Sequence, residues 1–167
     1  RKNLRDNDGD GLFGDDDDFR AFRHLMRRTQ REVPMRLVAY VLMPNHWHMV
    51  VWPHTAGDLW RFLHRLTGTH ASRLRRQLGT VGEGHIYQGR YKSIVIESPA
   101  QLVNVLRYVE ANPIRSRLVT RAEDWPWSSL RERMSATGVM SKGPIELPPL
   151  EEWLRIVNAG CTAVNHR

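Results

Sequence analysis

The sequence predicts an α+β protein, because a pair of adjacent strand patterns occurs among segments with helical periodicity. Residues 35–43 (MRLVAYVLM) are nearly all apolar, which is typical of a strand buried on both faces. Pro44 and Asn45 then give a turn signal, and residues 46–52 form a second strand, so the two strands pair as a hairpin. Three other segments carry apolar side chains at the spacing of core-facing helices: residues 15–31, 58–78 and 99–112.

The first elements follow from local signals. Residues 1–14 are polar and contain several glycines and aspartates, which predicts a loop. Aspartates at 15–18 favour the start of a helix, where negative charge is stabilised, and arginines occupy its last turn. The apolar stripe of this helix consists of Phe19, Phe22, Leu25 and Met26.

The second helix, residues 58–78, keeps its arginines largely off the apolar stripe. Gly68 allows a break or kink within it. The stripe consists of Leu59, Phe62, Leu63, Leu66, Leu74 and Leu78. A glycine-rich loop at 79–84 leads into residues 85–97 (HIYQGRYKSIVIE), which predict an extended strand with a glycine interruption.

The third helix is marked at both ends. Ser98 is a good N-cap, Pro99 takes the first helical position, and Gln101 completes a capping box. Pro113 ends the helix after Asn112, because the residue before a proline is disfavoured in the helical conformation.

The chain of 167 residues is most simply one domain with a sizeable core. Its last third contains a compact aromatic segment, DWPWSS at 124–129, and one short amphipathic piece around 151–157. The remaining tail from residue 138 is rich in proline and glycine.

The chain is basic, with a formal net charge of +7. Residues 1–19 contain three basic residues and seven aspartates, so the positive charge is carried by the rest of the chain. A strongly basic body suggests a polyanionic partner, with nucleic acid the first choice and an anionic membrane surface the second. The single cysteine, Cys161, excludes an internal disulfide and fits a reducing cytosol. No apolar run approaches the ~18 residues of a membrane span.

His46 and His48 lie one residue apart in the second predicted strand. Side chains at i and i+2 share a face, so both imidazoles can reach one metal ion while Trp47 points to the other face. One cysteine disfavours a structural zinc site, and the apolar residues after His48 supply no carboxylate for a hydrolytic zinc centre. A Mg²⁺ or Mn²⁺ site with mixed nitrogen and oxygen ligands, serving a phosphate, fits better. Two polar residues at a strand end are the alternative interpretation.

Tyr108 and Asn112 are four residues apart on the third predicted helix, so their side chains are neighbours. A tyrosine can act as a covalent nucleophile, and an amide oxygen can bind a hard metal ion. The alternative is a tyrosine at the edge of the core, with Asn112 as a helix C-cap.

Basic and aromatic residues alternate in the second helix and in the segment after it. Arginines bind phosphates and aromatic rings stack on unpaired bases, whereas the alternative is a solvated helix face with ordinary strand aromatics. The candidate DNA-binding residues are Arg61, Arg65, Arg73, Arg76, Tyr87, Arg90, Tyr91 and Lys92.

The acidic segment at 6–17 (DNDGDGLFGDDD) partly matches a calcium-binding loop. Asp17 stands where a glutamate is usual, and too few residues precede the loop for a helix. An acidic loop that leads into a helix N-terminus is therefore the better interpretation.

Four segments occur together in one order: MPNHWHMVVW, GHIYQGRYKSIVIE, RYVEANPIRSRLV and DWPWSS. In this combination the chain resembles the IS200-like single-tyrosine transposases. It is most similar to their branch associated with repetitive extragenic palindromes (REP), the REP-associated tyrosine transposases. The resemblance extends from about Leu12 to about Leu130.

This resemblance implies a ferredoxin-like antiparallel sheet with helices on one face. The first strand of that sheet is missing or degenerate here, because the segment RKNLRDNDGDG has no apolar alternation. On this basis residues 1–14 are an acidic N-terminal loop, residues 15–130 the catalytic domain, and residues 131–167 a partly helical C-terminal tail.

The resemblance also implies a single-stranded DNA nuclease and strand transferase of the His-hydrophobic-His type. His46, His48 and Asn112 would hold a divalent metal ion, Mg²⁺ or Mn²⁺, and Tyr108 would attack the scissile phosphate. The products would be a 5′-phosphotyrosine link and a free 3′-OH, and attack by another 3′-OH would rejoin strands without ATP.

A non-catalytic protein that binds structured single-stranded DNA is the alternative from another functional class. An enzyme needs Tyr108 and a divalent ion, whereas such a binder tolerates the loss of both. In either case the expected partner is single-stranded or hairpin DNA in the bacterial cytoplasm, with no membrane, and the protein is expected to be a monomer or a homodimer.

Overall fold

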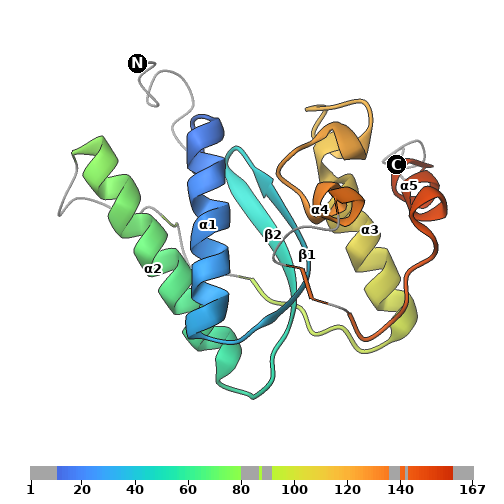
Figure 1. The fold of residues 1–167 in the computed structure, drawn as a ribbon, viewed down its shortest axis with the longest axis horizontal. Helices are drawn as coiled ribbons and strands as arrows, with labels where there is room; N and C mark the ends of the chain where they lie inside the picture. Colours follow the sequence, from blue (N-terminus) through green and yellow to red (C-terminus); the bar gives the residue numbers. More distant parts are fainter. Residues whose placement is uncertain (1–10, 80–86, 88–91, 136–139, 142, 160–167) are drawn as a thin grey trace. The chain divides into compact units, whose positions relative to one another are not determined.

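The computed structural model describes residues 11–79, 87, 92–135, 140–141 and 143–159. The α+β class is confirmed, because helices accompany an antiparallel sheet (Figure 1). The chain divides into two compact units. We call Arg1–Met35 with Pro53–Val95 the helical unit, and Arg36–Trp52 with Ile96–Arg167 the hairpin unit.

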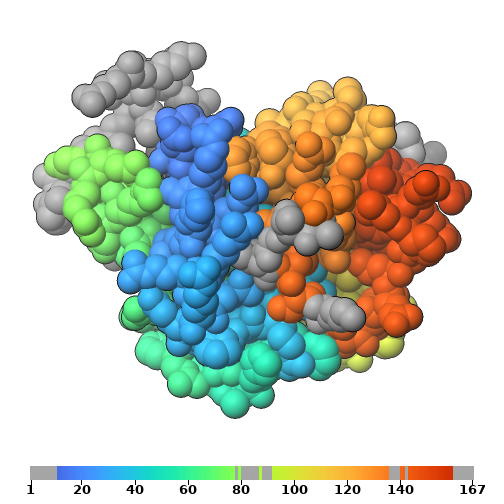
Figure 2. All heavy atoms as spheres, viewed as in Figure 1, coloured from blue at the N-terminus to red at the C-terminus, as the bar shows by residue number. Residues whose placement is uncertain are grey.

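The helical unit is built on helices α1 (Asp16–Glu32) and α2 (Asp58–Leu78), which pack side by side (Figure 1, Figure 2). Asp15 caps α1 by accepting hydrogen bonds from two backbone N–H groups of its first turn. Phe19, Phe22 and Met26 of the predicted stripe are buried, and Leu25 is half-buried. Helix α2 continues through Gly68 without the break that the sequence allowed.

The hairpin unit begins with strands β1 (Arg36–Met43) and β2 (His46–Trp52), which pair as predicted across the Pro44–Asn45 turn. All residues of β1 after the first are buried, as the apolar run indicated. Val38 is an extra residue that interrupts the register, which makes it a bulge. Cross-strand partners share a face, so one face of the hairpin carries Ala39, Val41, Met43, His46, His48 and Val50.

The aromatic segment at 124–129 covers the second edge of β1. The N–H of Leu42 donates to the carbonyl of Trp127 at 2.9 Å, and the indole of Trp125 donates to the carbonyl of Leu42 at 2.9 Å. This segment joins a short 3-10 turn, η1 (Ala122–Asp124), to helix α4 (Ser129–Ser135). An edge strand exposes unpaired backbone groups, and this segment satisfies those of Leu42 and the N–H of Tyr40, which donates to the hydroxyl of Ser129.

Helices α3 (Pro99–Arg115) and α5 (Leu150–Ala159) complete the hairpin unit. The core contains Val41 of β1, Leu106 of α3 and Trp153 of α5, so the predicted amphipathic piece at 151–157 is a core helix. The hydroxyl of Ser98 caps α3 by accepting from the N–H of Gln101. The Gln101 side chain accepts from the N–H of Glu97, one residue before the cap, so the capping box is confirmed only on the serine side.

The predicted end of α3 was wrong, because the helix continues past Pro113 to Arg115. Proline lacks an N–H, but its own carbonyl accepts from the N–H of Leu118, and the carbonyl of Ile114 accepts from the N–H of Arg117. These two bonds form a Schellman motif, which satisfies the last carbonyls of the helix. Arg117 occupies its left-handed position, with φ of 57°.

The predicted strand at 85–97 was wrong in its described part. Residues 92–97 form no strand, and the side chains of Ile94 and Val95 are exposed. A strand requires a hydrogen-bonding neighbour, and the sheet of the described residues contains only β1 and β2. The rest of this prediction, apart from residue 87, and the predicted degenerate first strand within residues 1–10 lie outside the described residues.

The predicted domain limits, 15–130 and 131–167, stay a prediction.

Among the helices that the structure describes, none combines the length and apolar character needed to cross a bilayer.

We predict that Arg117→Gly stabilises the protein. A side chain in the left-handed region costs about 1–2 kcal/mol, and glycine avoids this cost. The expected gain in free energy of unfolding is about 1 kcal/mol, measured by urea denaturation. Ser116→Gly is the control, because Ser116 has φ of −86° and gains nothing from glycine. Equal effects of the two substitutions would contradict the strain argument.

Candidate active site

The structure brings the two predicted imidazoles together and directs them at helix α3. The ring centroids of His46 and His48 are 4.9 Å apart, so the side chains share a face as the spacing predicted. That face also carries Val41, which packs in the core with Leu106 of α3. The apolar contact between hairpin and helix therefore sets the direction in which the imidazoles point.

Asn45 orients one of these imidazoles. Its side-chain oxygen lies 2.7 Å from Nδ1 of His46. An amide oxygen only accepts hydrogen bonds, so Nδ1 carries the proton in this arrangement and Nε2 keeps its lone pair. Residues that orient a metal-binding histidine in this way are a regular part of metal sites.

Helix α3 presents Tyr108 to the histidine pair. The ring centroids of His48 and Tyr108 are 5.7 Å apart, and Tyr108 is 45% exposed. A phenol in this position is accessible to a substrate from solvent. This exposure favours the interpretation of Tyr108 as a site residue over that of a residue at the edge of the core.

Asn112 lies one turn after Tyr108 on the same side of α3. It is only 6% exposed, and its side-chain amide makes no hydrogen bond to any residue that the structure describes. The alternative role as a C-cap is wrong, because α3 ends at Arg115 and its last carbonyls are satisfied by backbone N–H groups. A side-chain amide that no described residue contacts by a hydrogen bond is suited to an external ligand.

Both imidazoles favour their neutral form. Burial lowers the pKa of His46. Burial first, and then the charge of His46, lowers the pKa of His48. A neutral imidazole has the lone pair that a metal ion requires, so protonation would not prevent either histidine from serving as a ligand at neutral pH.

The donor set fits a hard divalent cation with an incomplete protein shell. Two imidazole nitrogens, together with the side-chain oxygen of Asn112, would leave positions for water or phosphate oxygens, as Mg²⁺ and Mn²⁺ sites do. Among the described residues, no group of three or more His, Cys, Asp or Glu side chains could hold a metal ion. The carboxylate that a zinc hydrolase needs beside His46 and His48 is therefore lacking in this part of the chain.

Arg115 is a candidate site residue that the sequence interpretation missed. Its guanidinium carbon lies 5.1 Å from the ring centroid of Tyr108. The spacing of Tyr108, Asn112 and Arg115 places all three on one side of the helix, which is the signal that could have identified it. A cation beside the phenol can contact a phosphate that reaches Tyr108.

The four predicted arginines of α2 fall into two pairs. Arg61 pairs with Asp58 at 2.7 Å, and Arg65 pairs with Glu32 of α1. Arg73 and Arg76 are exposed, and neither forms an ion pair with a described residue. The charges of Arg73 and Arg76 are therefore the more available to an anionic partner.

The other predicted DNA-binding residues differ in their outcome. The hydroxyl of Tyr87 lies 2.6 Å from Nδ1 of His70, a buried residue of α2, so Tyr87 has a structural contact. Burial, and then the charge of Arg73, lowers the pKa of His70 to about 4, so the imidazole is neutral in this contact at pH 7. Lys92 is exposed, whereas Arg90 and Tyr91 lie outside the described residues.

The acidic segment at 6–17 is described only from residue 11. Asp15 is the N-cap of α1 and Asp17 pairs with Arg20, which agrees with a helix-start role for these residues. The first half of the calcium-loop pattern lies outside the described residues.

An exposed aromatic pair adds to the surface of α2. Trp60 is 59% exposed, and its ring stacks on His64 with centroids 5.0 Å apart. Both residues lie next to arginines in the sequence, so the helix offers cations beside a flat aromatic surface.

A family model, two relatives and a solved structure that match this chain all concern transposases of one kind. The family described as "Transposase IS200 like" matches residues 11–112, which is more than half of the chain. The chain is similar to a REP-associated tyrosine transposase of Escherichia coli K12, with 26% identity over 66% of this chain. The alignment spans 64% of the length of that relative.

Two further proteins are similar. A protein named putative REP-associated tyrosine transposase, from Haemophilus influenzae, is 24% identical over 69% of this chain and 70% of its own length. A solved structure of a REP-associated tyrosine transposase bound to a REP hairpin matches with a TM-score of 0.59. That match covers 86% of this chain and 84% of the other at 18% identity, which shows a shared fold.

We predict that His46 and His48 are neutral at pH 7 and titrate below the ordinary histidine value of about 6.5, as followed by NMR. Because their folded pKa values are lowered, the stability they contribute is present above about pH 6.5 and is lost as pH falls through the folded values. His46→Gln should raise the pKa of His48, because it removes a neighbouring charge while burial persists. In the wild-type protein, a His48 pKa at or above the ordinary histidine value would contradict the predicted effect of burial and of His46.

Proposed function

The chain belongs to the IS200-like transposase family, and on this premise we propose that it is a REP-associated-type tyrosine transposase. It would cleave and rejoin single-stranded DNA at hairpins through a 5′-phosphotyrosine intermediate. The observation that carries the proposal is the ring contact between His48 and Tyr108, which combines a nucleophile with a candidate metal ligand. The names of the two relatives support the same class of activity.

Tyr108 is the proposed nucleophile. Its phenol oxygen forms a bond to phosphorus as the bond from phosphorus to the 3′ oxygen breaks. The phenol proton leaves to solvent, the 3′ oxygen takes up a proton, and the DNA 5′ end stays on the tyrosine. Because the phosphodiester energy is kept in the new bond, attack by a 3′-OH can reverse the step without ATP.

His46, His48 and Asn112 would hold a divalent cation, either Mg²⁺ or Mn²⁺. When bound, such a cation supplies charge stabilisation for the phosphate in the transition state. The Asn112 amide, which no described residue contacts by a hydrogen bond, and the neutral imidazoles support this assignment. Arg115 would hold a phosphate oxygen beside the Tyr108 ring.

Hairpin DNA is the proposed substrate, since the matching solved structure is described as bound to a REP hairpin. Arg73 and Arg76 would contact phosphates, while Trp60 would stack on an unpaired base. Arg61 and Arg65 would contribute less, because Asp58 and Glu32 already pair with them. A chromosomal substrate of this kind would place the reaction in the cytoplasm.

We predict that Tyr108→Phe abolishes the covalent protein–DNA adduct while leaving hairpin affinity within about twofold. The substitution removes only the attacking oxygen, so the surface that binds DNA is kept. The measurement is incubation with labelled hairpin oligonucleotides and Mn²⁺ or EDTA, followed by a denaturing gel and a native gel.

Tyr40→Phe is the matched control. Tyr40 is buried and its hydroxyl donates to Glu132 at 2.6 Å. Tyr40→Phe therefore tests the general effect of removing a tyrosine hydroxyl. Adduct in Tyr108→Phe would show that the nucleophile is another residue. Hairpin retardation without adduct in the wild-type protein would instead favour the non-catalytic binder.

We predict that the surface of α2 contributes to affinity in two separable ways. Replacing Arg73 and Arg76 by glutamine should weaken binding and make the plot of log K against log salt shallower by about 0.7–0.9 for each phosphate that the variant no longer neutralises. Trp60→Ala should weaken binding by about 1–3 kcal/mol with an unchanged slope, because stacking releases no counterions.

Arg20→Gln is the control for total charge. Arg20 lies on α1 and pairs with Asp16 and Asp17, so its loss should leave the slope unchanged. If Arg20→Gln lowers affinity as much as a single change at Arg73 or Arg76, the effect is one of net charge and the assignment to α2 is wrong.

A further inference from the structure

Glu110 lies between the two functional residues of α3 and points away from both. It is two residues from Tyr108 and two from Asn112, which places it about 160° from each around the helix axis. Its side chain is completely buried, with 0% exposure. A carboxylate in such a position is costly unless every oxygen is hydrogen-bonded.

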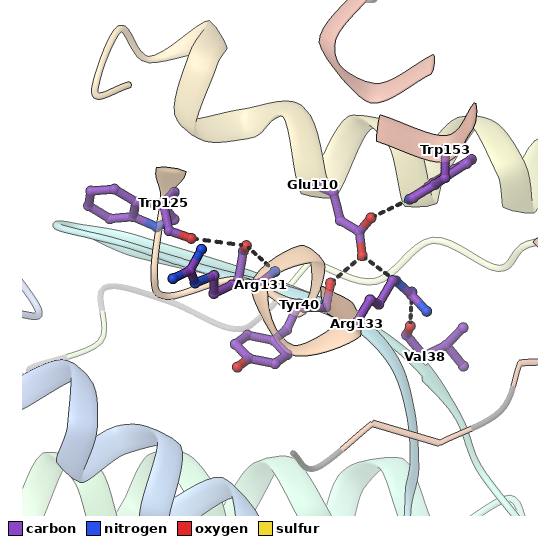
Figure 3. Close-up of polar contacts among 9 residues, drawn as sticks. Val38, Tyr40, Glu110, Trp125, Arg131, Arg133 and Trp153 are labelled. Carbon is purple, nitrogen blue, oxygen red and sulfur yellow. Dashed lines mark hydrogen bonds and ion pairs between the residues drawn. The ribbon is translucent and has the colours of Figure 1, made fainter. Parts of the chain in front are cut away.

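Three side chains from two other helices donate to this carboxylate (Figure 3). Oε1 accepts from the hydroxyl of Ser129 at 2.5 Å and from Nε of Arg133 at 2.8 Å. Oε2 accepts from the indole of Trp153 at 2.6 Å. Helix α3 is thereby held from α4 on one side and from α5 on the other.

Two of these donors also bind strand β1. The hydroxyl of Ser129 accepts from the N–H of Tyr40 at 3.1 Å. Nη2 of Arg133 donates to the carbonyl of Val38, the bulge residue, at 2.7 Å (Figure 3). Since β1 pairs with β2, a continuous set of hydrogen bonds joins Glu110 to the hairpin that carries His46 and His48.

We propose that Glu110 is a positioning residue, which fixes the rotation of α3 so that Tyr108 and Asn112 face the two histidines. The inference rests on the proposed function. Apolar contacts of Leu106 and Val109 press the helix against the hairpin but resist rotation weakly, because they are not directional. Charge-assisted hydrogen bonds have a preferred geometry and supply this restraint.

The geometry makes rotation matter for chemistry. The phenol oxygen of a tyrosine lies roughly 9 Å from its helix axis, so a rotation of about 20° moves it by about 3 Å. A misplacement of about 1 Å in a reacting group can slow a reaction by about 100-fold. A small change in the angle of α3 would therefore separate Tyr108 from the site.

The test is Glu110→Gln, which keeps the size of the side chain but places an amide NH₂ against one of its donors. The first readout needs neither DNA nor metal: the nuclear Overhauser effect between the rings of His48 and Tyr108, whose centroids are 5.7 Å apart in the structure. The second is the rate of adduct formation at a temperature at which the variant is folded. We expect the Overhauser effect to disappear and the rate to fall at least tenfold, with hairpin affinity within about twofold.

Glu123→Gln is the matched control. Glu123 is another buried carboxylate of the hairpin unit, and it accepts from Asn158 of α5 at 2.9 Å, but it belongs to η1 and not to α3. Its loss should lower the melting temperature without changing the Overhauser effect or the rate. If Glu123→Gln slows the reaction as much as Glu110→Gln, the effect is general destabilisation and the inference is wrong.

Trp153→Phe gives a second variant should Glu110→Gln not fold, because it removes one donor and keeps an aromatic ring in the core. We expect the Overhauser effect to weaken and the rate to fall severalfold. An unchanged Overhauser effect in the folded variants would overturn the inference. A wild-type protein that shows the effect but forms no adduct would overturn the proposed function instead, so the two failures are distinguishable.

Discussion

The hairpin unit depends on one ion pair, that of the buried Glu110 with the half-buried Arg133 (Figure 3). A buried carboxylate is tolerated only when donors surround it, and removing one partner of such a pair typically costs about 3–5 kcal/mol. Here the donors come from α4 and α5, and two of them also bind the backbone of β1. Through this carboxylate and its donors, strand β1 is joined to helices α3, α4 and α5, so none of these elements can shift alone without leaving a buried polar atom unpaired.

The hairpin illustrates why this support is needed. A two-stranded hairpin is at best marginally stable in water, and β1 is buried along nearly its whole length. One edge of β1 pairs with β2. On the other edge, Trp125 and Trp127 satisfy the backbone of Leu42, and Ser129 and Arg133 of α4 bond to the backbone of Tyr40 and Val38. With both edges of β1 satisfied and one face packed on α3, the orientation of His46 and His48 is a consequence of the core rather than of local preference.

The helical unit shows a different use of charge. The chain has a net charge of +7, but the charges of Arg61 and Arg65 are partly neutralised by Asp58 and Glu32. In both pairs the arginine side chain is at least half exposed, and ion pairs that water can reach contribute little to stability, typically below about 1 kcal/mol. They would matter more for the binding of an anion, because a paired arginine attracts a phosphate less than Arg73 or Arg76 would. The number of arginines in α2 therefore overstates how many are available to an anionic partner.

The sequence by itself determined the features that depend on neighbouring residues. Side-chain alternation placed His46 and His48 on one face, helical spacing placed Tyr108 beside Asn112, and Ser98 marked the start of α3. Only the tertiary structure decided the contacts between distant residues. His48 meets Tyr108 across sixty positions, and Glu110, which helical periodicity alone would assign to an ordinary buried face, meets Trp153 across forty-three. The Schellman motif at Arg117, the absence of a strand at residues 92–97 and the arginine ion pairs were also not readable from periodicity. The physical reason is that periodicity fixes which way a side chain points within its element, whereas packing and the pairing of buried polar groups select its partner.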